Sequence, residues 1–276
     1  MAQTCAVIAI STAIVSLFRH VSKNITDKMT FMPSKIEQIN MDSLVEHFGN
    51  HMKTGFIKNN DVNISYALYN KTKTPKWSDN IMFVCHGNGG WMMDSLYSPF
   101  INKLSDKYTI FMFDYRGYGL SSKIKPSEKG LYEDTRNAWD FVTSRHPDVN
   151  TILPFGYSLG SSIVSHLMKD LYIDKNPIPR DLILLAPFYS AKEISSDIVG
   201  VLGRLNPHSF ATNKYLKQIS DKINIIIFHS VEDEIINVRH SKMLINDNSC
   251  EFIPIRGSHN ICRLTRSAHD RLNQLI

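Results

Sequence analysis

The sequence predicts an α/β protein with a mostly parallel central sheet, and three observations support this fold class. Short continuous apolar runs are typical of strands covered on both faces, and segments with helical apolar spacing separate them. The runs end in glycine-rich or polar loops, which suits a site at the carboxyl ends of parallel strands, with helices on both faces of the sheet. The runs span 80–85, 108–114, 151–155, 182–186 and 223–228.

The whole chain is long enough for one large core. It has 276 residues, 43% of them hydrophobic, without repeats or low-complexity stretches, so a single domain is expected over residues 23–276. The net charge of +5 comes from dispersed lysines, and no basic cluster with interleaved aromatic residues predicts nucleic-acid binding. The four cysteines form no CxxC pair, which predicts neither disulfides nor a metal site and is typical of a reducing compartment.

The N-terminal segment 1–22 is expected to be separate from this domain. Residues 5–18 form a charge-free apolar run, shorter than the roughly 20 residues that span a bilayer, so a membrane anchor and a buried or loose helix are both open. The cations Arg19, Lys23 and Lys28 follow the run, whereas a secretory signal carries its cations first. By the positive-inside rule an anchor would leave the domain facing the cytoplasm, so a cytoplasmic protein is expected.

The first elements expected in the domain are a short helix over 42–51 and a β hairpin over 54–71. Asp42 can cap the helix. Alternating apolar residues on both sides of a polar turn at 59–61 indicate the hairpin, which forms one edge of the sheet. Further along the chain, a helix that begins at Pro126-Ser127 carries an apolar stripe, which indicates core packing.

The strand at 80–85 ends in a glycine-rich loop, His86-Gly-Asn-Gly-Gly90. Glycines directly after a central strand leave backbone N–H groups uncovered, so the loop can donate to an oxygen that becomes negative during a reaction. A phosphate or dinucleotide loop is disfavoured, because no Lys-Ser/Thr follows and Met92 replaces the third glycine of GxGxxG. A turn without a chemical role is the remaining alternative.

A helix is expected over 92–104, and the strand at 108–114 follows it. Asp114 and Arg116 lie at the end of that strand. Charged groups in such positions more often fix a loop than contact a substrate. We therefore predict a structural role for both residues.

Gly156-Tyr-Ser-Leu-Gly160 has the pattern GxSxG between a predicted strand and a predicted helix. A serine hydroxyl is a weak nucleophile, so catalysis needs it on a sharp strand-to-helix turn within reach of a histidine. Gly156 and Gly160 provide room, because a side chain two positions either side of the serine would collide across the bend. A plain glycine-rich turn is the alternative, but the flanking strand and helix favour a nucleophile at Ser158.

Two later loops hold candidate partners for Ser158. The strand at 223–228 leads to an acidic loop with Glu-Asp-Glu at 232–234, and a strand at 251–255 leads to His259. A nucleophilic serine needs a histidine base, and the histidine needs a carboxylate that holds its tautomer. A loop histidine, with an unperturbed pKa near 6.5, suits a base at neutral pH. The residues alone leave the acid open among the three, and leave a solvated histidine without a role as the alternative.

Residues 190–220 are where a lid over the site is expected. They contain mixed apolar residues and two short predicted helices. A stretch of this length allows only a minimal lid, so the pocket is expected to be open on one side.

The order of serine, acid and histidine, each just after a strand, is that of the α/β-hydrolases rather than of chymotrypsin or subtilisin. The chain resembles the α/β-hydrolase superfamily, and within it the Bem46-like group that includes α/β-hydrolase domain-containing proteins 13 and 17. The resemblance covers about residues 80–260. It rests on His86-Gly-Asn-Gly-Gly90, Asp114-Tyr-Arg-Gly-Tyr-Gly-Leu-Ser121, Pro126-Ser-Glu-Lys-Gly-Leu-Tyr-Glu-Asp134, Phe155-Gly-Tyr-Ser-Leu-Gly160, His229 to Asn237 and Gly257-Ser-His-Asn260.

The resemblance implies an α/β-hydrolase fold and assigns roles to particular residues. The pattern His-Gly-x-x-Asp of the group falls on Asp233, with departures at Ser230 and Asn237 that affect no catalytic group. The oxyanion donors would be the backbone N–H groups of Leu159 and Asn88, with Gly87 a structural residue beside them.

The activity that the resemblance implies is hydrolysis of a carboxylic ester or thioester by Ser158, His259 and Asp233, through an acyl-enzyme and without a metal or an organic cofactor. Relatives with membrane-anchoring N-termini favour the anchor at 5–18. Group members that remove acyl chains from proteins make a long-chain acyl thioester a candidate substrate.

Two alternatives to this activity stay open: an inactive, hydrolase-shaped binding protein, and a serine peptidase on the same fold. Pro154 supports the first, because it removes an N–H from the strand that leads to Ser158, in the middle of the sheet. A bulge would absorb the loss, whereas a shifted serine would weaken the site. The sequence does not predict the oligomeric state.

Overall fold

The computed structural model describes residues 27–275, apart from 28, 29, 35, 37–39 and 60. The segment 1–22, with its apolar run at 5–18, lies outside the described residues. Within the described part of the chain, no helix is both long enough and apolar enough to cross a membrane.

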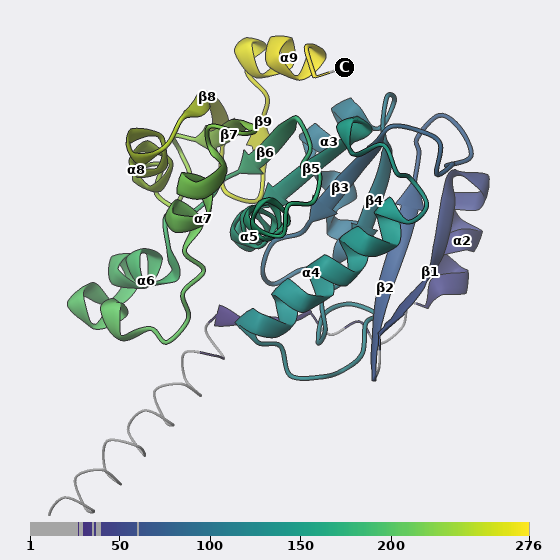
Figure 1. Ribbon diagram of the computed structural model, residues 1–276, viewed down its shortest axis with the longest axis horizontal. Helices are drawn as coiled ribbons and strands as arrows, with labels where there is room; N and C mark the ends of the chain where they lie inside the picture. Colours follow the sequence, from purple (N-terminus) through teal and green to yellow (C-terminus); the bar gives the residue numbers. More distant parts are fainter. Residues whose placement is uncertain (1–26, 28–29, 35, 37–39, 60, 276) are drawn as a thin grey trace, which may run out of the picture.

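A nine-stranded, mostly parallel sheet forms the centre of the molecule (Figure 1). Its strand order is β1-β2-β4-β3-β5-β6-β7-β8-β9, with antiparallel pairing only at β1–β2, β2–β4 and β8–β9. The predicted hairpin forms one edge of this sheet. The strands are β1 (Met52–Asn59), β2 (Val62–Tyr69), β3 (Ile81–Cys85), β4 (Thr109–Phe113), β5 (Ile152–Tyr157), β6 (Asp181–Leu185), β7 (Asn224–Ser230), β8 (Cys250–Gly257) and β9 (Cys262–Arg263).

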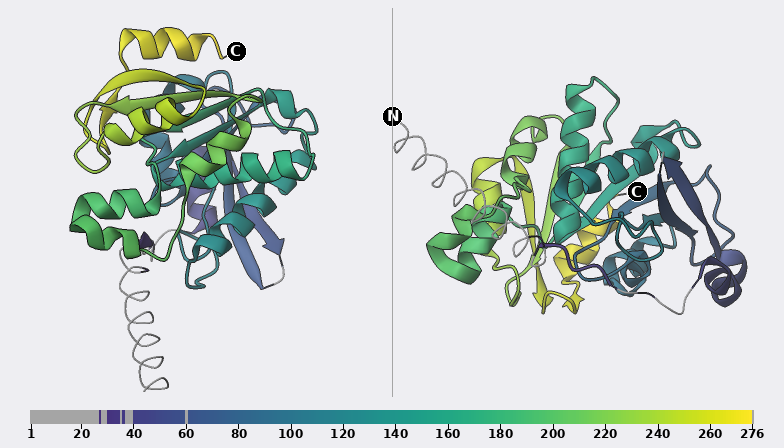
Figure 2. Two further views of the ribbon diagram at one scale, coloured as in Figure 1. Left: turned by 60° about the vertical axis from the view of Figure 1, so that its left-hand side comes forward. Right: turned by 90° about the horizontal axis from the view of Figure 1, so that it is seen from below.

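Helices cover both faces of the sheet (Figures 1 and 2). One face packs against α4 (Glu128–Thr143), α5 (Leu159–Ile173), α7 (Thr212–Ile219) and α8 (Arg239–Asp247). The other packs against the 3₁₀ helix η2 (Met92–Tyr97), α3 (Pro99–Leu104) and α9 (Arg266–Asn273), with α2 (Met41–Phe48) beside β1. The remaining helices are η1 (Gly49–His51), η3 (Val149–Thr151), α6 (Ala191–Val199) and η4 (Gly200–Leu205). The mostly parallel α/β fold predicted from the sequence is confirmed.

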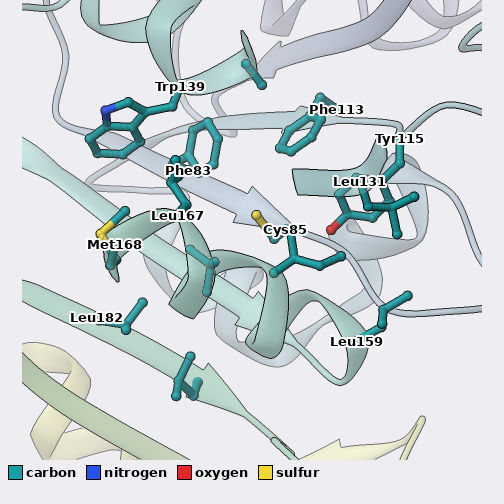
Figure 3. Packing of buried hydrophobic residues seen from close by; sticks show 14 of the residues in the cluster. Phe83, Cys85, Phe113, Tyr115, Leu131, Trp139, Leu159, Leu167, Met168 and Leu182 are labelled. Carbon is teal, nitrogen blue, oxygen red and sulfur yellow. The ribbon is translucent and has the colours of Figure 1, made fainter. Parts of the chain in front are cut away.

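Strand β3 shows why the central runs are continuously apolar. Its side chains alternate between the two faces: Phe83 and Cys85 enter one core, whereas Met82 and Val84 enter the other. All four are at most 1% exposed. Phe83 meets Trp139 of α4 edge to face, with ring centroids 5.3 Å apart (Figure 3). Burying a side chain of this size stabilises the fold by about 1.5–3 kcal/mol, so both faces of β3 must be apolar.

The order of the strands brings two predicted loops together. The chain places β4 on one side of β3 and then crosses to place β5 on the other side. Such a reversal leaves a crevice at the carboxyl ends of the strands. The loops that follow β3 and β5 therefore meet there, and they carry Asn88 and Ser158.

Pro154 does not disturb the sheet. Its register with Phe83 of β3 continues without a bulge, and the ladder between β5 and β6 begins one residue later, at Phe155. The bulge considered for this position is absent from the register of these strands.

Three elements differ from their predictions. The helix expected over 92–104 is split into η2 and α3, because Ser98 is extended and Pro99 starts a new helix. The cap of α2 is Asn40, whose side chain accepts a hydrogen bond from the N–H of Ser43, rather than Asp42. A short strand, β9, which was not predicted, follows the strand expected at 251–255.

The stretch predicted to hold the lid divides into two parts. Helix α6 and η4 project from the body of the molecule (Figures 1 and 2). Helix α7, in contrast, packs against α5 as part of the core. The lid itself stays a prediction, and α6 and η4 are the elements that can form it.

Candidate active site

Ser158 lies on a strained turn between β5 and α5. Its backbone φ and ψ are 54° and −117°, a conformation that residues other than glycine rarely adopt. The Ser158 N–H donates to the carbonyl of Leu185, 2.9 Å away, and the Ser161 hydroxyl donates to the carbonyl of Gly156, 2.8 Å away. These bonds hold the turn in place. A strained residue fixed in this way at a strand end is typical of a functional position.

The glycines of GxSxG are required by close backbone contacts. A Cβ atom on Gly160 would lie 2.0 Å from the carbonyl oxygen of Cys85, and one on Gly156 would lie 2.5 Å from that of Gly160. Gly87 has the same role in the facing loop, because a Cβ there would lie 2.9 Å from the Tyr157 ring. The loop after β3 and the turn after β5 can approach each other only because these positions lack side chains.

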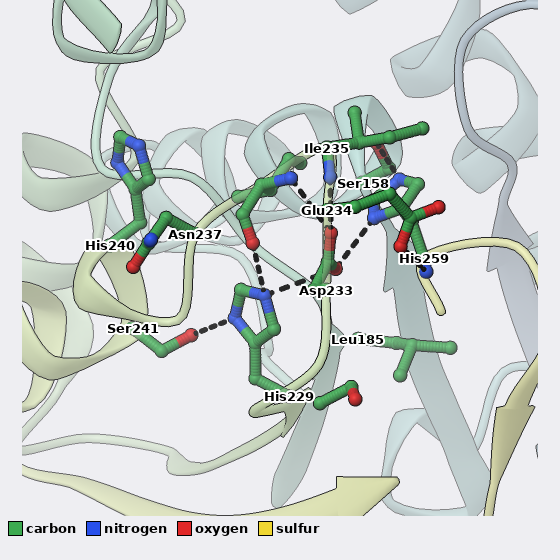
Figure 4. A network of polar contacts seen from close by, with 12 residues as sticks. Ser158, Leu185, His229, Asp233, Glu234, Ile235, Asn237, His240, Ser241 and His259 are labelled. Carbon is green, nitrogen blue, oxygen red and sulfur yellow. Dashed lines mark hydrogen bonds and ion pairs between the residues drawn. The ribbon is translucent and has the colours of Figure 1, made fainter. Parts of the chain in front are cut away.

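His259 connects Ser158 to Asp233 (Figure 4). Its Nε2 lies 3.2 Å from Ser158 Oγ, and its Nδ1 lies 2.7 Å from Asp233 Oδ2. Because an ionised carboxylate only accepts, Nδ1–H donates to it, which leaves Nε2 as the acceptor for the serine hydroxyl. The structure thus brings together all three predicted catalytic residues.

Asp233 is held as an anion by four N–H groups. Its Oδ1 accepts hydrogen bonds from the backbone of Ile235 and Ile236, and its Oδ2 lies 2.7 Å from His259 Nδ1 and 3.2 Å from His229 Nε2. Burial alone would raise the pKa of Asp233, but the hydrogen bonds from His229 and His259 outweigh it. The pKa of this carboxyl therefore lies well below its ordinary value, and the group is charged at neutral pH.

The other two acids of the loop have different contacts. Glu232 accepts a hydrogen bond from the N–H of Gly257 at 2.8 Å, and Glu234 accepts one from the N–H of His259 at 3.0 Å. Both attach the acidic loop to the backbone around the histidine. Only Asp233 reaches the imidazole ring.

Two residues that the sequence did not single out support the histidine and the acid. His229 is fully buried; its Nδ1 accepts from the Ser241 hydroxyl and its Nε2–H is shared between Asp233 and the carbonyl of Ile236. The Tyr157 hydroxyl donates to the carbonyl of His259, 3.0 Å away. His229 belongs to a stretch used for the family resemblance, but neither side chain's contact follows from a sequence pattern.

The predicted oxyanion donors line the same pocket as Ser158. The N–H groups of Asn88 and Leu159 have no acceptor within the described part of the chain, so both are free to bind an oxyanion. The Asn88 side chain is already engaged: it accepts from the Tyr118 hydroxyl and donates to the carbonyl of Thr30. These contacts hold the Asn88 side chain toward Thr30 and Tyr118 and fix the loop that carries the Asn88 backbone N–H.

Asp114 and Arg116 have the structural roles predicted for them. Buried Asp114 accepts hydrogen bonds from the N–H groups of Met92 and Leu120. Arg116 forms an ion pair with Asp134 of α4, with the two groups 2.8 Å apart. Both residues fix the loop after β4.

A pocket of about 810 Å³ opens above Ser158 and His259. Its walls are mostly apolar. They include residues of η2, α3, α6 and η4, and Phe155, Leu185 and Phe188 from elements next to the serine turn. Its size is in the range of pockets that bind small organic ligands. An apolar chain of moderate length can be accommodated next to the hydroxyl of Ser158.

The buried carboxylate of Asp233 should make the stability of the fold depend on pH. Because the folded pKa of Asp233 lies below the unfolded value of about 3.9, its stabilising effect is present above that pH and is lost as the pH falls toward the folded pKa. We expect the melting temperature of the wild type to fall more steeply than that of Asp233→Asn as the pH is lowered from about 5 to about 2. Parallel slopes in differential scanning calorimetry would contradict this.

The fold and the geometry of this site define an α/β hydrolase. Within that class, the chain belongs to the family described as "Serine aminopeptidase, S33", whose model matches residues 77–234. The narrower Bem46-like group remains a prediction.

Three relatives illustrate the family. A protein of Acanthamoeba polyphaga mimivirus, named as an α/β hydrolase, is 30% identical over 247 residues, which cover 85% of this chain and 87% of that protein. The uncharacterized protein YfhR of Escherichia coli is 33% identical over 162 residues, 58% of this chain and 54% of that protein. The α/β-hydrolase domain-containing protein 17C of Xenopus tropicalis is 28% identical over 172 residues, 60% of this chain and 52% of that protein.

Solved structures share the fold at lower identity. An α/β hydrolase from Vibrio vulnificus has a TM-score of 0.70 at 20% identity, covering 94% of this chain and 90% of that chain. An esterase from Pyrococcus furiosus has a TM-score of 0.65 at 13% identity, covering 89% of this chain and 96% of that chain.

Proposed function

We propose that the protein is a serine hydrolase that cleaves carboxylic esters or thioesters. The observation that carries this proposal is the unbroken chain of hydrogen-bond contacts from Ser158 Oγ through His259 to Asp233, at 3.2 Å and 2.7 Å. The three side chains come from separate loops and meet beneath an apolar pocket. An inactive binding protein would have no need for this alignment on a strained turn.

The contacts support the following reaction. Ser158 Oγ attacks the acyl carbonyl while His259 Nε2 takes its proton, and Asp233 stabilises the imidazolium that forms. The N–H groups of Leu159 and Asn88 donate to the oxyanion. His259 returns the proton to the leaving alcohol or thiol, and water then attacks the acyl-enzyme with His259 as base.

The pocket favours an acyl group over a peptide. A peptide substrate needs polar partners for its amide groups, because a buried amide without a hydrogen bond costs about 1–3 kcal/mol. The walls above Ser158 are instead formed mainly by apolar side chains such as Phe155, Leu185 and Phe188. An acyl-protein thioester or a lipid ester fits this surface. A cytoplasmic location with residues 5–18 as anchor is part of the same proposal.

A fluorophosphonate probe tests the proposal, because it reacts only with an activated serine. We expect covalent labelling of the wild type at the peptide that contains Ser158, identified by mass spectrometry. Asp233→Asn should be labelled far more slowly, since replacing the acid of such a triad lowers turnover by about 10⁴. Hydrolysis of p-nitrophenyl esters of increasing chain length would then measure the acyl preference. A folded wild type that takes up no probe would refute the proposal.

A further inference from the structure

The most exposed large apolar side chains of the described residues gather around one opening. They are between 61% and 88% exposed, and they come from three segments that are distant in sequence: η2, the stretch from α6 to η4, and the loop between β8 and β9. We refer to these six residues as the apolar rim: Tyr97, Ile198, Val201, Leu202, Leu205 and Ile261.

The rim surrounds the mouth of the pocket above Ser158. Four of its members line the pocket, whereas Val201 and Ile261 do not line it but adjoin residues that do. Helix α6 and η4 carry most of the rim away from the body of the molecule (Figures 1 and 2). Large apolar side chains that are this exposed and gather around one pocket mouth indicate a site of interaction rather than an ordinary solvated face.

The charge around the rim indicates what it contacts. The stretch 198–205 contains five large apolar residues and one charge, the cation Arg204, and no acid. Arg263, which is also exposed, follows the loop of Ile261. Neither arginine forms an ion pair with another described residue, whereas the acids that flank the rim, Asp197 and Glu232, are paired with Arg239 and Arg256. Apolar side chains bordered by cations suit the surface of a bilayer with anionic headgroups.

The start of the described chain lies on the same side. Asp27 lies 2.8 Å from His208, just after η4, and Phe31 packs edge to face on the His208 ring. The apolar run 5–18 ends nine residues before Asp27. Nine fully extended residues reach at most about 30 Å, so the run ends within that distance of Asp27. A membrane that held this run would therefore be within reach of the rim.

We propose that the apolar rim docks on an anionic lipid bilayer, so that the pocket opens onto the membrane surface. A second copy of the chain would also cover apolar residues, but it would close the mouth through which a substrate enters. The preference for a bilayer over a second copy rests on the function proposed above, because it assumes that a substrate enters through this mouth. Acyl chains of membrane lipids or lipidated proteins would then reach Ser158 without crossing water.

Tryptophan placed on the rim tests the contact directly. Val201 is 74% exposed and does not line the pocket, so Val201→Trp in the full chain adds a reporter outside the site. The matched control is Ile173→Trp. Ile173 is 55% exposed and lies at the far end of α5, about 21 Å from the Ser158 end of the helix. The emission of the wild type, which comes from Trp77, Trp91 and Trp139, is subtracted from that of each variant. With vesicles of phosphatidylcholine and phosphatidylserine, we expect a blue shift and quenching by brominated lipid in the difference spectrum of Val201→Trp alone.

A second pair of variants links docking to turnover. Val201→Ser with Ile261→Ser should lose turnover of an ester embedded in these vesicles and retain turnover of soluble p-nitrophenyl acetate. Phe56→Ser with Ile173→Ser should retain both. Fluorophosphonate labelling of the same samples reports Ser158 separately, so an inactive serine and an undocked rim give different results.

Three results would overturn the proposal. Equal quenching of Val201→Trp and Ile173→Trp would show that the rim does not enter the lipid. Emission from Val201→Trp that is already blue-shifted without vesicles and does not respond to them would show that the rim is covered, by residues 5–18 or by a second copy. Light scattering would distinguish these two cases, because only a second copy doubles the molecular mass. Unchanged turnover of the embedded ester by the variant with Val201→Ser and Ile261→Ser would show that the pocket does not receive its substrate from the membrane through the rim.

Discussion

Ser158→Ala is expected to lower kcat for p-nitrophenyl ester hydrolysis by about 10⁶-fold, the loss typical of removing the nucleophile from a serine triad. No other hydroxyl can substitute, because His259 Nε2 contacts only Ser158 Oγ among the described residues. The fold should be unaffected, since the side chain loses one hydrogen bond and no apolar contact of consequence. Circular dichroism and steady-state kinetics on the same preparation measure both effects.

Ser162→Ala is the matched control for this variant. Ser162 lies one turn further along α5, is fully buried, and its hydroxyl has no hydrogen-bond partner among the described residues. Alanine there removes an unsatisfied polar group and leaves His259 untouched, so full activity is expected. Substantial turnover by Ser158→Ala beside an active Ser162→Ala would place the reaction elsewhere in the pocket.

The central strands and the loops of the site could be predicted because their cause is local. A strand covered on both faces must be apolar throughout, as β3 and β5 are. The functional groups directly follow β3, β5 and the equally apolar β7, so finding these strands also locates Asn88, Ser158 and the acidic loop. Secondary structure and candidate residues therefore came from the same pattern.

Contacts between distant segments could not be predicted from such patterns. The choice among the acids at 232–234 depends on which carboxylate meets His259, and the residues alone left it open. The contact between His229 and Asp233 is equally hidden, because it depends on how one loop folds back over the end of β7. The assignment of α7 to the core rather than to a lid depends on its packing against α5, which no local spacing encodes.

Gly160→Ala should destabilise the fold more than any other small substitution near the site. A Cβ atom at this position would lie 2.0 Å from the carbonyl oxygen and 2.6 Å from the carbonyl carbon of Cys85. Alanine gains about 1 kcal/mol over glycine in a helix, but overpacking costs about 1–3 kcal/mol and occasionally more, and a contact of 2.0 Å with rigid backbone lies at the upper end of that range. The cost of the clash exceeds the gain in helix propensity, so the free energy of unfolding should fall by about 2 kcal/mol or more.

Gly90→Ala separates this clash from the loss of a glycine as such. A Cβ on Gly90 would approach Asp94 Oδ2 at 2.6 Å, and this oxygen accepts a hydrogen bond from the Trp91 N–H at 3.1 Å. The Asp94 side chain can rotate away at the cost of that cap, about 1 kcal/mol, so the destabilisation should be smaller than for Gly160→Ala. For a domain of this size, 2 kcal/mol corresponds to a fall in melting temperature of about 4–8 °C, measurable by calorimetry. Because α5 would have to move away from β3 to relieve the contact, Gly160→Ala should also displace Ser158 from His259 and lose fluorophosphonate labelling. Equal stability of the two variants would mean that the approach of α5 to β3 is looser than these distances imply.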